Sequence, residues 1–146
     1  MLRETRGSPM TDPLRLVNQV DIKKVLLLED DELVSKFIKM ALESKGMDVV
    51  TVSNGVEGVH AIKDADFEAI ICDMMMPKLP GDMFYLAVER IKPHLCPRFI
   101  FITGYKDDPK INDFLKKVNG ALLLKPFKMD DLLEMMAFIQ VRPHIS

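Results

Sequence analysis

Five short apolar segments, separated by stretches with helical periodicity, constrain the fold of this chain more than any other feature. The segments are residues 25–28, 49–52, 69–72, 99–102 and 121–124. Four of them are nearly continuous in apolar residues, as strands covered on both faces are. Only the second is interrupted, by Thr51, so we expect it at an edge of the sheet. Strands that alternate with helices in this way predict an α/β fold with a parallel sheet.

The stretches between these runs carry apolar residues at the three- and four-residue spacing of amphipathic helices. The first helix should bury a face made of Leu33, Val34, Phe37, Ile38 and Ala41. It should end before Gly46, because glycine suits a left-handed helix end. A shorter helix is expected after Asn54 and Gly55, and others around residues 83–91, 111–118 and 132–139. Asp108 before Pro109 is expected to begin the fourth helix. The pattern predicts a doubly wound sheet with helices on both faces.

One domain is expected, because 146 residues with 48% hydrophobic content supply a single substantial core. We assign residues 23–141 to this domain and residues 142–146 to a short tail. Residues 1–22 are polar and broken by glycine and proline, and we interpret them as an extension without an assigned function.

Charge and cysteine content exclude several kinds of partner and site. The 20 Lys and Arg residues against 22 Asp and Glu residues give a formal net charge of −2, so no overall field attracts nucleic acid or anionic lipid. Cys72 and Cys96 form no CxxC pair, which favours reduced thiols over a disulfide or a zinc site. No apolar stretch is long enough to cross a bilayer. We therefore expect a cytoplasmic protein that binds neither nucleic acid nor membrane.

Acidic residues follow two of the predicted strands. Glu29 and Asp30 come directly after the first strand, and Asp73 directly after the third. Doubly wound sheets bind ligands outside the carboxyl ends of their strands, so these three carboxylates should converge at one edge. Their repulsion is commonly offset by a hard divalent cation, and Mg²⁺ is the natural candidate. Taken alone, the acidic residues 29–32 are also typical of a helix N-terminus.

Two further strands end in groups that suit phosphoryl chemistry. Thr103 closes the fourth strand with a hydroxyl, and Lys125 closes the fifth with an ammonium group. Alone, such a threonine commonly bonds neighbouring backbone, and such a lysine is commonly a solvated turn residue. Together with a carboxylate nucleophile and an acidic metal site, they match the requirements of phosphoryl transfer.

This combination resembles the signature of the response-regulator receiver family. The resemblance rests on Glu29-Asp30, Asp73, Thr103 and Lys125-Pro126-Phe127 in this order. The separations from Asp30 onward are 43, 30 and 22 positions, and the match runs from residue 23 to about residue 140. It implies a flavodoxin-like receiver fold with strand order 2-1-3-4-5, of the stand-alone chemotaxis type, acting in two-component signal transduction.

The resemblance also implies a role for each matched residue. Mg²⁺ would be held by Glu29, Asp30, Asp73 and the backbone carbonyl of Met75. Asp73 would attack the phosphohistidine of a sensor histidine kinase or a histidine phosphotransfer protein, and Lys125 and Thr103 would contact the phosphoryl oxygens. The Lys125–Pro126 bond is expected to be cis. The phosphorylated chain would act on a downstream protein target, and dimerisation on phosphorylation is left open.

One position departs from the usual pattern of the family. Many receivers carry an aromatic residue three positions before the lysine, which moves together with the threonine, whereas this chain has Leu122. Transmission through such an aromatic is therefore in doubt. Tyr105 and the methionines at 74–76 are bulky residues near the acceptor, and we hypothesise that they prolong the life of the phosphoryl group. Gap filling by adaptable methionines is an equally good interpretation.

Two other functions compete with a single-domain phosphoacceptor that serves as an adaptor or a phosphorelay intermediate. A phosphorylation-independent binding module is favoured by Leu122 but opposed by the complete set of acids, hydroxyl and lysine. A phosphatase of the haloacid dehalogenase type also uses an aspartate nucleophile, but it needs D-x-D after the first strand and a cap domain. Here the sequence is Glu29-Asp30-Asp31, and we expect no room for a cap. We therefore expect a signalling domain rather than an enzyme.

Overall fold

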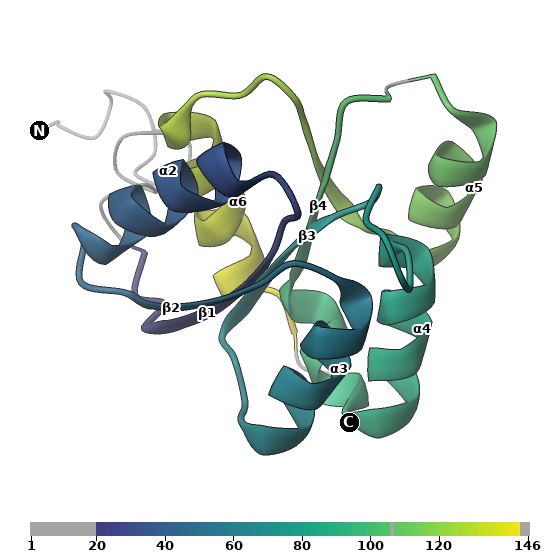
Figure 1. Cartoon of the computed structure of the whole chain (residues 1–146), viewed down its shortest axis with the longest axis horizontal. Coiled ribbons are helices and arrows are strands. Elements are labelled where there is room, and N and C mark those ends of the chain that lie inside the picture. Colours follow the sequence, from purple (N-terminus) through teal and green to yellow (C-terminus); the bar gives the residue numbers. More distant parts are fainter. Residues whose placement is uncertain (1–19, 106, 144–146) are drawn as a thin grey trace, which may run out of the picture.

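The computed structural model describes residues 20–105 and 107–143, which form a central sheet between two layers of helices (Figure 1). The strands are β1 (Lys24–Leu28), β2 (Asp48–Val52), β3 (Ala69–Asp73), β4 (Phe99–Thr103) and β5 (Ala121–Leu124). All neighbouring strands pair in parallel, in the order β2-β1-β3-β4-β5. The predicted fold class and strand order are confirmed, and β2 lies at an edge as Thr51 indicated.

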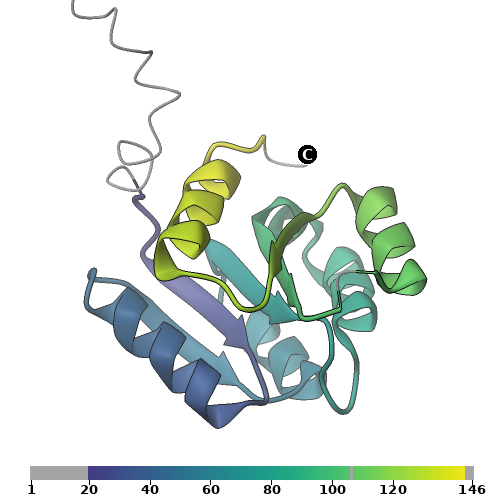
Figure 2. The same cartoon turned by 90° about the horizontal axis from the view of Figure 1, so that it is seen from above.

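Helices cover both faces of this sheet. They are α2 (Glu32–Glu43), α3 (Gly55–Asp64), α4 (Gly81–Ile91), α5 (Pro109–Val118) and α6 (Met129–Gln140), with a 3₁₀ helix η3 (Pro93–Arg98) between α4 and β4. Figures 1 and 2 show α2 and α6 on one side of the sheet and α3, α4 and α5 on the other. Alternate residues of the central strands therefore enter two separate apolar clusters, one under each helical layer.

The predicted core face of α2 is partly wrong. Ile38 and Leu42 are fully buried, but Leu33 and Phe37 are 80% and 55% exposed. The helix carries apolar residues on two sides, and periodicity alone does not decide which side meets the sheet. The i, i+4 pair Ile38 and Leu42 packs against the sheet, while Leu33 and Phe37 lie outside this core cluster and stay exposed.

The helix boundaries have local causes. The Asp31 side chain accepts hydrogen bonds from the N–H groups of Leu33 and Val34 and begins α2. Asp108 begins α5 in the same way, as predicted, and Asn119 ends it in a left-handed conformation. Gly46, with φ +91°, turns the chain after α2. These caps set where each strand-to-helix loop starts.

The domain limits proposed from the sequence fall partly outside the described residues. Residues 1–19 of the predicted extension and residues 144–146 of the predicted tail are not described. Ile22, inside the predicted extension, is buried in the cluster beneath α2 and α6. None of the helices in residues 20–105 and 107–143 has the length and apolar character that a bilayer-spanning segment requires.

Candidate functional site

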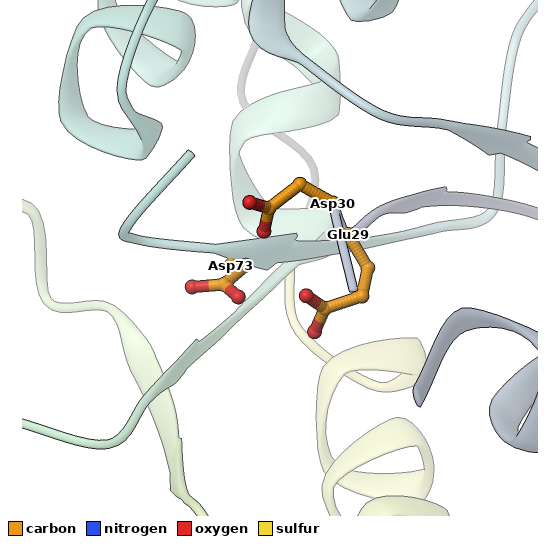
Figure 3. Close-up of side chains that lie close together, drawn as sticks. All are labelled: Glu29, Asp30 and Asp73. Carbon is orange, nitrogen blue, oxygen red and sulfur yellow. The ribbon is translucent and has the colours of Figure 1, made fainter. Parts of the chain in front are cut away.

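The carboxyl ends of β1, β3, β4 and β5 bring together the residues on which the sequence argument depended. Backbone pairing continues to these ends, because the N–H of Lys125 donates to the Thr103 carbonyl at 2.8 Å and the N–H of Met74 donates to the Ile102 carbonyl at 2.9 Å. Figure 3 shows the carboxylates of Glu29, Asp30 and Asp73 gathered at this edge. One ligand atom from each of the three lies within 4.8 Å of the others. The predicted convergence of acids is confirmed.

Asp73 stands at the centre of the site and is only 4% exposed. Its Oδ1 accepts a hydrogen bond from the N–H of Met75 at 2.9 Å, and its Oδ2 accepts one from Lys125 Nζ at 2.9 Å. Both carboxylate oxygens are therefore oriented by neighbours. A carboxylate held in this way has little rotational freedom left to lose on binding or reaction.

Glu29 is a buried acid whose surroundings oppose its charge. Its Oε2 accepts a hydrogen bond from the N–H of Asp31 at 3.1 Å. Its Oε1 lies 3.0 Å from Lys125 Nζ, yet among the described residues it accepts no hydrogen bond of normal geometry. Burial, followed by the neighbouring Asp73 carboxyl, raises the pKa of Glu29 to about 7, against the opposing effect of Lys125.

Lys125 bridges these two acids. Burial lowers the pKa of its ammonium group, but the hydrogen bond to Asp73 and the contact with Glu29 outweigh burial, so the pKa is raised overall. The side chain is 29% exposed and lies 2.9 Å from Asp73 Oδ2. A cation is thereby kept beside the Asp73 carboxylate.

The acidic residues fit a magnesium ion. All three side chains offer carboxylate oxygens, which hard divalent cations prefer. The buried Glu29 Oε1 without a hydrogen bond is the kind of atom that a cation, or a water bound to one, would satisfy. For the predicted carbonyl ligand, the structure shows that the N–H of Met75 binds Asp73, which keeps this residue beside the acceptor.

Thr103 is 1% exposed, and its Oγ1 accepts a hydrogen bond from the N–H of Tyr105 at 3.0 Å. The bond to neighbouring backbone, raised above as the simpler role for this threonine, is thus present. It uses an oxygen lone pair and leaves the hydroxyl hydrogen free to donate.

The remaining predicted residues surround this centre. The Lys125–Pro126 bond is cis, as expected. Leu122 is half-buried and pairs in register with Phe101 of β4. Tyr105 is 57% exposed and therefore does not close over the site in this conformation.

The three methionines after the acceptor divide into two kinds. Met74 and Met76 are buried in the cluster beneath α3, α4 and α5. Met75 is 50% exposed beside Asp73. Met74 and Met76 therefore fit the interpretation that methionines fill gaps in the core. Of the three, Met75 alone is exposed, beside Asp73.

Comparison with known proteins identifies the family. The protein-family model of the response regulator receiver domain matches residues 25–137, which is most of the chain. The chain belongs to the response regulator receiver family. It is 30% identical over 111 residues to the response regulator receiver protein CpdR of Brucella abortus, covering 76% of this chain and 91% of CpdR. It is 31% identical over 112 residues to the cell cycle transcriptional regulator CtrA of Caulobacter vibrioides, covering 75% of this chain and 47% of CtrA.

Solved receiver structures agree with this assignment. The chemotaxis protein CheY4 of Vibrio cholerae is 26% identical, with a TM-score of 0.73 over 81% of this chain and 98% of that one. By contrast, the match to the sensor kinase CckA of Brucella abortus covers only 11% of the kinase. The activities of the longer relatives therefore are not carried over to this receiver domain.

One contact in the site was not predicted from the sequence. Glu29 was expected to bind the metal alone, whereas Lys125 Nζ lies 3.0 Å from Glu29 Oε1 as well as 2.9 Å from Asp73 Oδ2. No local sequence signal links residues at opposite ends of the domain. Strand order places these strand ends at one edge of the sheet, but β3 and β4 lie between β1 and β5, so the contact also needs the length of the Lys125 side chain.

Proposed function

We propose that this receiver domain accepts a phosphoryl group on Asp73 from the phosphohistidine of a sensor histidine kinase or a histidine phosphotransfer protein. An Asp73 oxygen attacks phosphorus, the phosphorus–nitrogen bond of the donor breaks, and the imidazole leaves. The observation that supports this proposal is the pair of hydrogen bonds that fixes the buried Asp73 carboxylate, one from Met75 N–H and one from Lys125 Nζ.

Other groups at the same edge have matching roles. Lys125 stays protonated because its pKa is raised, so its ammonium group offsets charge on the transferring oxygens. The buried Thr103 hydroxyl, at the carboxyl end of the strand beside β3, donates to a phosphoryl oxygen. Glu29, Asp30, Asp73 and the Met75 carbonyl would hold Mg²⁺. The ion, when bound, adds positive charge opposite the phosphoryl oxygens.

The output is a change in protein binding. We assign the chain no substrate turnover beyond its own phosphorylation and dephosphorylation, and we place it in the cytoplasm as a single-domain response regulator. Leu122 presents no hydroxyl and less area than an aromatic residue, so the change at Thr103 reaches a downstream protein without the aromatic relay common in receivers.

Intact-mass analysis after incubation with a small acyl phosphate tests this function. With Mg²⁺, the native chain is expected to gain the mass of one phosphoryl group. Chelator and the Asp73→Asn substitution are each expected to abolish the gain. Turnover of a small phosphomonoester that is lost with Asp30→Asn but kept with Asp73→Asn would contradict the proposal and favour a phosphatase.

The phosphoryl group is expected to be long-lived, because the bulky Met75 side chain lies beside Asp73, where it would restrict the approach of hydrolytic water. Its decay is measured after removal of the donor. Complete loss within seconds would contradict this part of the proposal.

A further inference from the structure

The loop of residues 74–80 connects the phosphoacceptor to α4 and carries the carbonyl of Met75. Its ends are well fixed. Met74 N–H donates to the Ile102 carbonyl at 2.9 Å, and Gly81 N–H returns to the Met74 carbonyl at 3.3 Å. The middle of the loop therefore depends on other contacts for its position.

The middle of this loop adopts an unfavourable backbone conformation. Lys78 and Leu79 have φ values of 52° and 75°, in the left-handed region that residues other than glycine rarely occupy. Such conformations are unfavourable for residues that carry a Cβ atom. They persist only where the surrounding structure holds them in place.

Leu79, in this part of the loop, packs closely against Gly55, the first residue of α3. A Cβ atom added at Gly55 would lie 2.3 Å from the Leu79 carbonyl oxygen and 2.7 Å from the Leu79 Cβ. Gly55 itself is outside the left-handed region, so its own backbone would accept alanine. Alanine is also the better helix former. The requirement for glycine at this position therefore comes from the loop, which packs directly against the helix backbone.

We propose that Gly55 is a positioning residue for the metal site, because its contact with Leu79 fixes the loop that presents the Met75 carbonyl. This inference rests on the proposed role of that carbonyl as a magnesium ligand. An added methyl group would push the Leu79 backbone away by roughly 1 Å to restore a normal contact. Mg²⁺ demands near-ideal octahedral geometry, so a displaced carbonyl weakens binding.

Gly58, one turn later on the same helix, provides a matched control. A Cβ atom at Gly58 would lie 2.6 Å from Leu28 Cδ2 and 2.8 Å from Phe84 Cε1, which are side-chain atoms under the helix and not part of the loop. Both Gly55→Ala and Gly58→Ala therefore crowd α3, but only the first displaces the acceptor loop.

Calorimetric titration of the metal-free chain with Mg²⁺ tests the inference, with denaturant unfolding to report stability. Gly55→Ala is expected to weaken Mg²⁺ affinity about 10-fold, the scale seen when residues that orient metal ligands are changed. Gly58→Ala is expected to change affinity less than twofold, whatever its effect on stability. In phosphorylation assays, Gly55→Ala should raise the Mg²⁺ concentration needed for half-maximal rate more than it lowers the rate at saturating Mg²⁺.

Leu79→Gly removes the Leu79 Cβ from this contact, keeps the carbonyl oxygen, and lets the left-handed loop backbone relax, so it serves if Gly55→Ala does not fold. Leu79→Gly is expected to weaken Mg²⁺ affinity as well. Because both substitutions act on the same contact, the double variant should bind Mg²⁺ no less tightly than the single variant with the lower affinity. Equal affinities for Gly55→Ala and Gly58→Ala, or native affinity in Leu79→Gly, would overturn the inference. Failure of the native chain to bind Mg²⁺ would instead overturn the proposed function.

Discussion

Buried charged side chains lie at both ends of the sheet, but their partners differ. At the carboxyl ends of the strands, Glu29 and Asp73 both contact the ammonium group of Lys125, and the pKa of Glu29 is raised to about 7. At the amino ends, Arg98 is equally buried, but its Nη1 donates to the Ile139 carbonyl and its Nη2 to the Arg142 carbonyl at 3.1 Å. These carbonyls belong to the last turn of α6 and the residues after it.

We infer from this difference that Arg98 contributes to the stability of the fold, whereas the acids and Lys125 contribute to the chemistry of the site. Carbonyls at a helix end need partners, and a guanidinium there also interacts favourably with the helix dipole. The Arg98 guanidinium thus adds a second kind of donor to the Ile139 carbonyl, which also accepts from the N–H of Arg142, and supplies a donor to the Arg142 carbonyl. The acids at the other end are held close together although they repel each other, which a domain selected for stability alone would avoid. This contrast predicts that substitutions at the two ends affect different measurements.

The largest effect is expected from Lys125→Met. The substitution removes the cation beside Asp73 Oδ2, and loss of one such stabilising group lowers rates about 100-fold or more. The rate is measured by intact mass over time with a small acyl phosphate and saturating Mg²⁺. A rate within twofold of the native value would mean that Lys125 has no role in the transfer.

Arg98→Met tests the opposite end of the sheet. The substitution removes the side-chain donor of the Ile139 and Arg142 carbonyls, of which Ile139 keeps the N–H of Arg142, so the free energy of unfolding is expected to fall by about 1 kcal/mol. Phosphorylation of the folded chain should stay within twofold of native. Denaturant titration measures the free energy of unfolding. A loss of phosphorylation without a loss of stability would contradict the assignment of Arg98 to stability alone.

An effect of similar size is expected from pH. Because the pKa of Glu29 is raised to about 7 in the folded chain, the folded state holds a proton that the unfolded state has already released. The free energy of unfolding in chelator should therefore fall by about 1 kcal/mol between pH 6 and pH 8. Glu29→Gln should remove this component, as determined from denaturant titrations at the two pH values. An identical pH dependence in native and variant chains would show that Glu29 is not the group responsible.

The sequence predicted the sheet better than it predicted the helix faces. In a chain that alternates strands and helices, a continuous apolar run such as residues 99–102 predicts a strand buried on both faces. All five of the predicted strands are present. The helix α2 has apolar residues on two sides, and the assignment of Leu33 and Phe37 to the core was wrong. Which side faces the sheet depends on tertiary packing, which helical periodicity alone does not report.

The site could be predicted as a set of residues but not as a geometry. Strand ends in a parallel sheet meet at one edge, so Asp73, Thr103 and Lys125 could be grouped before any coordinates were known. Their distances could not, and neither could the close contact between Gly55 and Leu79, because both depend on how loops from different strands pack. Asn54 and Gly55 indicated only the start of a helix.

The most direct test of the account is the chemical position of the phosphoryl group. The native chain is phosphorylated with a small acyl phosphate and Mg²⁺, reduced with borohydride, which converts an aspartyl phosphate to homoserine, and analysed by peptide mass spectrometry. The account predicts homoserine at residue 73 alone. Homoserine at Asp30, or phosphate retained on a hydroxyl side chain with residue 73 unmodified, would contradict it.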